Sequence, residues 1–297
     1  MRYIILFLFA ALFASCQDKI DSELTLGKEK LVVYAFPSTN DSIFINISIG
    51  KVKNGKAEKP VIKSIECLVN GKRDNIAHKC DTEENGIYET SFCAVGKHAP
   101  GDTITINVSA EGALPVSGSS IIPQKPKAEY IYMDTTSYKG EIYNRILYNI
   151  HDFNSIKYYA AQVAGAVDND NEQEKHETVE LEVENEPLLK KYASTKINFE
   201  TYESFYANMY IFDNETFNNG ANSLHLYILQ RPWYNAFNVK IYSLSKEYFC
   251  MLKSFNNSMN NDFGKHGMAF IYPTYSNIKN GYGCIAAYNV IESGWTK

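Results

Sequence analysis

The sequence predicts a mainly β protein, in which an immunoglobulin-like sandwich precedes a larger β-rich domain with one packed α-helix. Three observations lead to this fold class. Apolar side chains alternate with polar ones in short segments along most of the chain, which is the period of half-buried strands. Turn signals separate these segments, and a helical spacing of apolar residues stands out in one stretch near residue 250. Short strands with regular turns are typical of sandwiches.

The first half of the chain consists of predicted strands and turns. The strand segments, recognised by apolar runs or by alternation, are 31–36, 43–49, 65–69, 86–92 and 104–110. Asn70-Gly71 follows the third segment and is a strong signal for a two-residue hairpin. Pro100-Gly101-Asp102 marks a turn before the last segment. This spacing predicts a small sandwich of immunoglobulin-like or fibronectin-like type.

A proline-containing stretch, Pro123-Gln124-Lys125-Pro126, interrupts this pattern. We therefore predict two domains, a sandwich over 28–123 and a β-rich domain over 124–297. Strand segments continue at 142–150, 179–183, 224–228, 237–241 and 284–290. Apolar residues between 244 and 259 recur at helical spacing, and Ser243 or Ser245 can cap the helix. We expect one amphipathic helix at about 245–258, packed on a sheet.

The N-terminus has the pattern of a lipoprotein signal peptide. Arg2 precedes an apolar run over 4–13, which is too short to cross a bilayer because a crossing takes ~20 residues. Ala14-Ser15-Cys16 resembles the bacterial lipobox, in which the cysteine is lipidated and the preceding residues are removed. We predict a signal peptide at 1–15, lipidation of Cys16 and a polar tether over 16–27. The alternative is an ordinary secretory signal with an incidental cysteine.

Composition narrows the classes of partner. The formal net charge is −5 and no basic block occurs, which argues against nucleic acid as a partner. The 22 tyrosines fit strand propensity, and the alternative is a carbohydrate-binding surface. Five cysteines follow Cys16, and their pairing stays open, although an odd number leaves at least one thiol unpaired. They are Cys67, Cys80, Cys93, Cys250 and Cys284.

Short motifs that resemble catalytic or metal sites fail on their context. Residues 281–286 match a dinucleotide-binding GxGxxA pattern, but the βαβ setting is missing. Residues 168–174 have the first spacings of a calcium loop without its glycine. The two SxxK matches, 48–51 and 243–246, lack partner motifs. We therefore predict a protein that is not an enzyme, with no metal and no cofactor other than the lipid on Cys16.

The C-terminal third resembles a known family. The residues that carry the resemblance are 211–214, Gly220, 245–249, 272–283 and 286–288. Together with the lipobox and the first strands, they resemble the Bacteroidota lipoproteins grouped as domain of unknown function 4249, although Cys284-Ile285 departs from the usual apolar or aromatic pair. The resemblance implies an outer-membrane lipoprotein, often encoded beside TonB-dependent transporters. It supplies no ligand and no catalytic residue.

Two further patterns agree with export. Acidic residues after Cys16 resemble the surface-export signal of Bacteroidota lipoproteins, which predicts display on the cell exterior. Residues 41–43, 102–104 and 134–136 resemble the O-glycosylation acceptor of exported Bacteroidota proteins. We therefore expect a protein of the outer membrane, held there by its lipid anchor.

Two segments are candidates for a contact surface. Trp233 and Tyr234 lie in a break between strands, where exposed aromatic side chains can insert into a partner or stack on sugars. The second segment is the C-terminal ending, with Tyr275, Ser276, Asn277, Ile278, Gly281, Tyr282 and Gly283. The structural alternatives are packing under the loop for the first segment and tight turns for the second.

The hypothesis that fits these observations is a non-catalytic lipoprotein that assists an outer-membrane β-barrel such as a TonB-dependent transporter. It would capture a nutrient, gate the barrel or brace it. The alternative is a stand-alone adhesion protein or a binder of glycans or peptides. A third possibility is a hydrolase with unrecognised residues.

Overall fold

The computed structural model describes residues 30–39, 42–49, 52–53, 56–57, 59–84, 87–151, 157–167, 175–192, 209–215, 217, 221–259 and 274–296. The predicted signal peptide, Cys16, the tether and the acidic loop 168–174 lie outside these residues. Strands dominate the described part of the chain, which confirms the mainly β class. None of the described helices is long and apolar enough to cross a membrane.

The first sandwich is built from two facing sheets. One sheet contains, in spatial order, β19 (Tyr282–Ile285), β1 (Leu31–Ala35), β2 (Ser42–Ile49), β8 (Ile87–Val95) and β7 (Asn75–Glu84). The other contains β10 (Val116–Ile121), β9 (Thr103–Ala110), β5 (Ile62–Val69) and β6 (Lys72–Arg73). A separate ladder joins β3 (Val52–Lys53) to β4 (Lys56–Ala57).

Alternation along the strands builds the core of this sandwich. Ile43, Ile45 and Ile47 of β2 are fully buried, and they belong to one cluster with Ile104 and Ile106 of the facing sheet. The predicted hairpin at Asn70-Gly71 is confirmed, because both residues have the positive φ angles (50° and 80°) that such a turn requires.

The second sandwich also has two sheets, with a core of its own. One sheet contains β11 (Ala128–Tyr138), β12 (Glu141–His151), β17 (Ala221–Leu229) and β15 (Leu181–Glu182). The other contains β14 (Lys175–Thr178), β13 (Tyr158–Val167), β18 (Tyr234–Leu244) and β20 (Tyr288–Thr296), and β16 (Tyr210–Asp213) also pairs with β13. The short helix α2 (Pro187–Lys190) adds Leu188 and Leu189 to the core.

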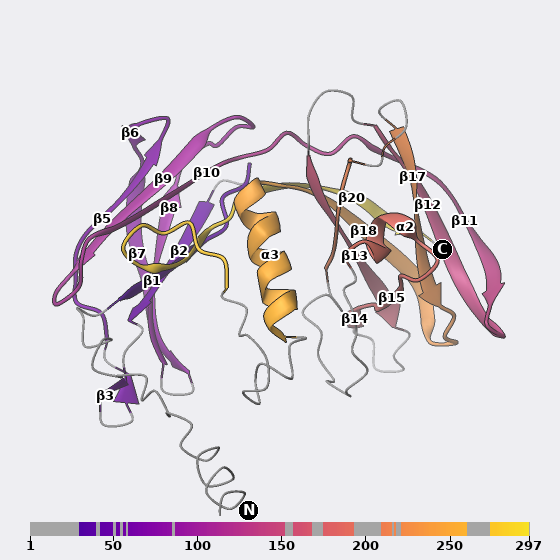
Figure 1. Cartoon of the computed structure of the whole chain (residues 1–297), viewed down its shortest axis with the longest axis horizontal. Helices are drawn as coiled ribbons and strands as arrows, with labels where there is room; N and C mark the ends of the chain where they lie inside the picture. The colour runs from indigo at the N-terminus through magenta and orange to yellow at the C-terminus, as the bar shows by residue number, and fades with distance from the viewer. Residues whose placement is uncertain are drawn as a thin grey trace, which may run out of the picture.

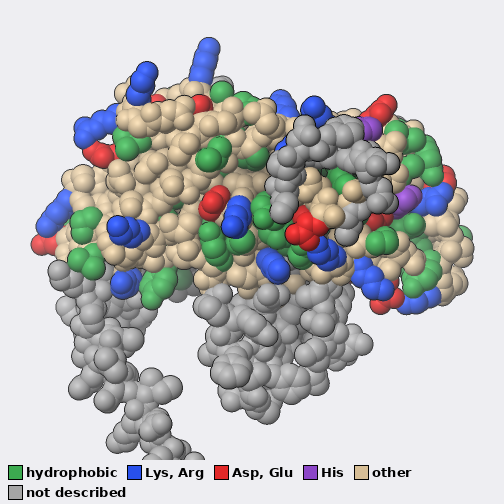
Figure 2. All heavy atoms as spheres, turned by 45° about the horizontal axis from the view of Figure 1, so that its top comes forward, with side chains coloured by type: hydrophobic (Ala, Val, Ile, Leu, Met, Phe, Trp, Pro, Cys, Tyr) green, Lys and Arg blue, Asp and Glu red, His purple; other side chains and the backbone are tan. Residues whose placement is uncertain are grey.

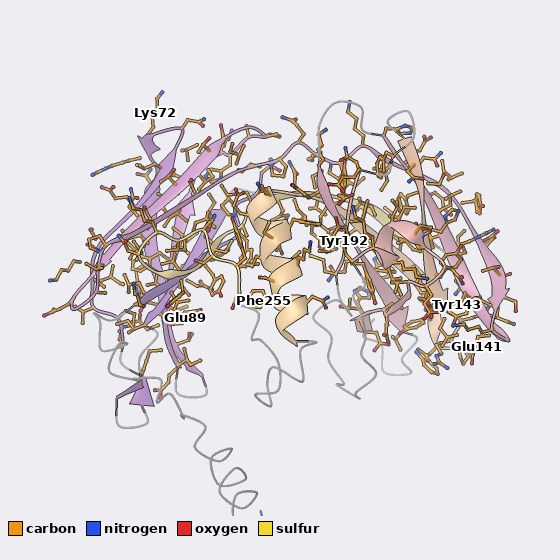
Figure 3. All side chains as sticks on the ribbon, in the orientation of Figure 1. Lys72, Glu89, Glu141, Tyr143, Tyr192 and Phe255 are labelled. Carbon is orange, nitrogen blue, oxygen red and sulfur yellow. The ribbon has the colours of Figure 1, made fainter. Side chains whose placement is uncertain are left out.

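Helix α3 (Lys246–Met259) lies between the two sandwiches (Figure 1). The predicted helix at 245–258 is therefore confirmed, but it packs on both sandwiches. Phe249 and Leu252 belong to a buried cluster with strands of the second sandwich. Met251 packs with Cys284 of β19, and Phe255 joins this cluster from the side of α3 that faces the first sandwich (Figure 3). The helix thus links the two sandwiches, and Tyr248 packs against both clusters.

The predicted last strand, 284–290, is two strands in different sandwiches. β19 pairs in parallel with β1 of the first sandwich, whereas β20 pairs with β18 of the second. Figure 1 shows this C-terminal segment, in yellow, reaching the first sandwich. Ile278 and Ile285 accordingly belong to the first core, although both fall in the predicted domain 124–297. The domain boundary near Pro123 stays a prediction, but residues at the end of the chain pack in the first sandwich and not only in the second.

Backbone shape explains how β19 reaches β1. Gly283 has a φ of +102°, and a Cβ atom there would lie 2.0 Å from the carbonyl oxygen of Val33. Only glycine permits both this angle and this approach. The parallel pairing gives β1 a neighbour on what would otherwise be an open edge.

Candidate functional site

The first predicted contact segment is partly buried. Trp233 lies in the turn between β17 and β18 with 45% of its surface exposed, and the guanidinium of Arg231 lies 5.7 Å from its ring. Tyr234 is half-buried, and its hydroxyl donates a hydrogen bond of 2.6 Å to Glu177. Trp233 is therefore the more accessible of the two aromatic residues.

The second predicted contact segment is largely built into the fold. The side chain of Asn277 donates to the carbonyl oxygens of Ser119 (3.0 Å) and Ile285 (2.9 Å), and it accepts from the backbone N–H of Ile285 (2.9 Å). Ile278 is buried in the first core. A Cβ atom at Gly281 would lie 2.6 Å from the carbonyl oxygen of Leu31. We call residues 275–283 the C-terminal clasp.

The remaining residues of the clasp differ in exposure. Tyr275 is half-buried beside α3, and its backbone N–H donates 2.7 Å to the hydroxyl of Ser254. The hydroxyl of Ser276 accepts from the N–H of Ile278 at 3.2 Å. Tyr282, by contrast, is 57% exposed. The structure therefore separates the two predicted segments: Trp233 belongs to the second sandwich, and Tyr282 opens β19 in the first. Their role in a contact stays a prediction.

Buried polar groups fix the junction between the sandwiches. The hydroxyl of Ser120 donates a hydrogen bond of 3.0 Å to the carboxylate of Glu247 in α3, and it accepts one of 3.3 Å from the N–H of Ala287. The side chain of Asn289, which is 2% exposed, donates 3.2 Å to the carbonyl oxygen of Pro123. Such satisfied buried groups hold one arrangement, because any displacement would leave them without partners.

An open cleft of about 810 Å³ lies at this junction. Its walls come from the first sandwich, from the linker and from the second sandwich. The lining residues are Thr39, His98, Ala99, Pro100, Gln124, Lys125, Pro126, Lys127, His151, Lys157, Tyr159 and Ser243. This volume is within the usual range for small-molecule sites, which are common between domains.

The lining of the cleft is basic. Lys125, Lys127 and Lys157 line it, and none of the described lining residues is aspartate or glutamate. His98 is fixed in the wall, because its side chain is fully buried and its Nε2 lies 3.1 Å from an Oδ atom of Asp74. The protein as a whole is acidic, and charges of both signs are interspersed over the face drawn in Figure 2. The cleft therefore has lysines in its lining although the protein has a net negative charge.

Strand β11 forms an open edge of the second sandwich. Within the described chain it pairs with β12 alone, and the register shifts by one residue between Tyr130 and Tyr132. Tyr130, Ile131 and Tyr132 are consecutive and are 40%, 39% and 38% exposed. Exposed apolar runs are rare on soluble surfaces unless they contact something. We call this segment the β11 edge.

The outer face of the same sheet combines charged and aromatic groups. Arg145 of β12 donates two hydrogen bonds to Asp134 of β11, and its guanidinium lies 5.8 Å from the ring of Tyr132. The Arg145 hydrogen bonds lower the pKa of Asp134. Nearby, Glu186 is buried and accepts from both the backbone and the ring of His225. Burial raises the pKa of Glu186, although these hydrogen bonds oppose the shift.

The five described cysteines are free thiols. Burial raises the pKa of Cys67 to about 12, and the charge of Asp74 contributes in the same direction. Burial likewise raises the pKa of Cys284 to about 12, with a contribution from Glu247. Both thiols are therefore protonated at neutral pH and are poor nucleophiles. Groups of three or more potential metal ligands are absent from the described part of the chain.

Sequence reasoning missed both the cleft and the β11 edge. Lys125 served there only as part of a boundary signal and Lys127 was not singled out, because their neighbours in the cleft, such as Lys157, are distant in sequence. The run Tyr130-Ile131-Tyr132 does not alternate between apolar and polar residues, so it gave no strand pattern. The sequence showed only three apolar residues after a predicted domain boundary.

Comparisons with known proteins complete the description. The profile of the family described as domain of unknown function (DUF4249) matches residues 17–293. No curated protein matches the chain. Among solved structures, the chain is similar to the adhesin InvE of Yersinia pseudotuberculosis, with 12% identity and a TM-score of 0.22 over 74% of this chain and 57% of the adhesin chain. The match therefore spans little more than half of that adhesin.

Proposed function

Because the chain belongs to the DUF4249 family, we propose that it is a lipid-anchored, non-catalytic surface protein that assists an outer-membrane β-barrel, such as a TonB-dependent transporter. The lipobox ending at Cys16 supports attachment to a membrane. The acidic residues behind it support display on the outer face. In this proposal the two sandwiches form one fixed body beside the barrel.

The observation that carries the proposal is the β11 edge. An edge strand offers a row of unpaired backbone donors and acceptors, and natural proteins usually shorten, charge or cover such edges. β11 spans eleven residues (Ala128–Tyr138), and its longest exposed stretch consists of Glu129 followed by three apolar residues. An extended segment of a partner can pair with such an edge, while exposed rings give it side-chain contacts.

A β-barrel protein is a partner whose chemistry suits this edge. Its chain consists of strands and connecting loops, so extended segments are available at its surface. The edge places Tyr130 and Tyr132 beside the unpaired backbone, and aromatic side chains are the commonest anchors at protein interfaces. The register shift at Ile131 increases local twist, which restricts pairing to a segment of matching shape.

Co-purification from native membranes tests this proposal. The full lipidated chain is solubilised from outer membrane in mild detergent, and co-purifying proteins are identified by mass spectrometry. We expect a β-barrel at near one-to-one ratio with the native chain and its loss with Ile131→Lys. Ile87→Lys is the matched control, because Ile87 is 59% exposed in the first sandwich and away from the edge. Purification of the native chain without a barrel would contradict the proposal.

A second candidate function is binding of a glycan by the sheet face beside the edge. Tyr132, Asp134 and Arg145 lie on this face, and Tyr227 lies directly opposite Arg145 on the neighbouring strand. Aromatic rings with adjacent charged hydrogen-bonding groups are suited to sugars. The test is binding of the full chain to a glycan array without a barrel, where Tyr132→Ala should abolish binding and Tyr282→Ala should not.

A further inference from the structure

The junction cleft contains chemistry that a contact at the β11 edge does not use. We propose that it binds a small polyanion, a molecule with two or more carboxylate or phosphate groups. The inference rests on the proposed function in one respect, since such a ligand would be the cargo of an accessory protein that captures nutrients. Binding itself needs no barrel and is tested separately.

The linker provides two of the positive charges. Lys125 and Lys127 are exposed and both line the cleft, whereas Pro126 between them is buried. Pro126 lines the cleft as well, and its burial holds the linker in place while the two lysines stay accessible. Ile122 is fully buried before this segment, and Ala128 begins β11 after it, so the linker is anchored at both ends.

The opposite wall provides the third charge. Lys157 lies directly before β13 of the second sandwich, and its backbone N–H donates 2.9 Å to the side chain of Asn214. The lysine is therefore carried by a segment that is hydrogen-bonded to the end of β16. Positive groups on two walls can contact separate acidic groups of one ligand, which is why the site fits a polyanion.

Neutral groups complete the lining. Gln124 and Ser243 are among the lining residues and have side chains that donate hydrogen bonds. Gln124 comes from the linker and Ser243 from β18. Thr39 also lines the cleft, but its hydroxyl donates to the side-chain oxygen of Asn289 at 3.2 Å. Donors on two elements define an orientation for the ligand in addition to its charge.

The walls are preformed. Asp74 holds His98, and Gly96 lies so close to Asp74 that an added Cβ atom would be 2.8 Å from its carboxylate oxygens. On the other side, the backbone N–H of His151 donates a hydrogen bond of 2.9 Å to the carbonyl oxygen of Lys127, which ties the linker to the end of β12. The ring Nε2 of His151 lies 4.0 Å from Glu129. Because Glu129 is 70% exposed, water screens its charge.

Isothermal titration of the full lipidated chain in non-ionic detergent tests the inference. The probes are inorganic phosphate and citrate, which distinguish phosphate from carboxylate recognition, and glucose is the uncharged control. We expect one saturable site per chain for at least one anion and no heat from glucose. Lys125→Gln with Lys127→Gln should weaken that binding about tenfold or more, because two charge-assisted contacts are lost.

The matched control is the double variant Lys63→Gln with Lys72→Gln, which removes the same charge from exposed positions of the first sandwich. Both lysines lie outside the cleft, and Figure 3 shows Lys72 at the tip far from α3. Binding in this variant should stay within about twofold of the native value. Circular dichroism verifies that both variants remain folded.

Two results would overturn the inference: an absence of saturable binding for both anions, or an equal loss in the two double variants, which would indicate general attraction to surface charge. Neither result tests the contact with a barrel, which is measured separately by co-purification of the native chain and of Ile131→Lys. Conversely, loss of the barrel contact would leave the titration unchanged.

Discussion

Strand β1 has a neighbour on both sides, whereas strand β11 has a described neighbour on one side only. β1, in the first sandwich, has β19 as a parallel neighbour, and the C-terminal clasp holds that pair in place. β11, in the second sandwich, has no described neighbour beyond β12 and exposes three consecutive apolar residues. The comparison shows that the chain covers β1 with its own C-terminal segment and leaves β11 accessible. The closed edge is structural, whereas the open one is available for a partner.

The largest expected effect comes from reopening the closed edge with Gly283→Ala. The new Cβ atom would meet the backbone of Val33, and the φ of +102° disfavours alanine. We expect the free energy of unfolding to fall by more than ~3 kcal/mol, measured by urea denaturation.

Gly140→Ala separates the two causes of that loss. Gly140 also has a positive φ (+82°), but an added Cβ atom has nothing within 4 Å. Its cost should therefore be about 1–2 kcal/mol, which is the conformational penalty alone. Equal losses in the two variants would mean that the approach of β19 to β1 is not as tight as described.

Asn277→Ala should have the next largest effect. It removes the hydrogen bonds to Ser119 and Ile285, and leaves their backbone groups without these partners. We expect a loss of about 2–3 kcal/mol in the free energy of unfolding. Asn277→Asp keeps the acceptor but not the donors, so its loss should be large as well. An unchanged unfolding curve would contradict a stabilising role of the C-terminal clasp.

At the open edge, Ile131→Lys should behave differently. Ile131 is 39% exposed and lies at the register shift, so its replacement removes little packing. The free energy of unfolding should change by no more than about 0.5 kcal/mol. A loss as large as that of Asn277→Ala would show that the β11 edge is part of the core, and the contrast between the edges would disappear.

The smallest effect concerns pH at the same edge. The hydrogen bonds from Arg145 lower the pKa of Asp134 in the folded state. The contribution of this pair is therefore present above the unfolded pKa of an aspartate, about 4, and is lost as the pH falls through the lower folded value. Asp134→Asn should remove this part of the acid sensitivity. Stability curves of both proteins between pH 5 and pH 2 (about the range of the change) provide the measurement.

Local patterns predicted the local parts of this fold. The alternation of Ile43, Ile45 and Ile47, the Asn70-Gly71 turn and the helix near residue 250 all depend on neighbours in sequence. The parallel pairing of β19 with β1 joins residues some 250 positions apart, and no local pattern encodes it. For the same reason the segment 284–290 was predicted as one strand, although Ala286 and Ala287 carry the chain between two sandwiches.

The candidate sites were harder to predict than the fold. Asn277, Gly281 and Gly283 were recognised as unusual, but the tight turns were predicted at the wrong residues, because the positive φ angles lie at Asn280 (61°) and Gly283 (102°). Asn277 instead acts through its side-chain hydrogen bonds, and Gly281 through its close approach to Leu31. The cleft could not be predicted, because the linker and Lys157 line it from segments that only the folded chain brings to one place. Exposure of the β11 edge depends on which strand ends a sheet, which sequence alone does not specify.

The central claim is that the open edge is the surface that contacts a β-barrel. The most direct test is a photo-crosslinking amino acid placed at Ile131, Trp233 or Tyr282 of the full lipidated chain, with irradiation of intact cells and identification of the products by mass spectrometry. We predict a crosslink to an outer-membrane β-barrel from position 131 that is much stronger than from the other two. A crosslink to a barrel from position 233 or 282 alone, or from none of the three, would contradict the claim.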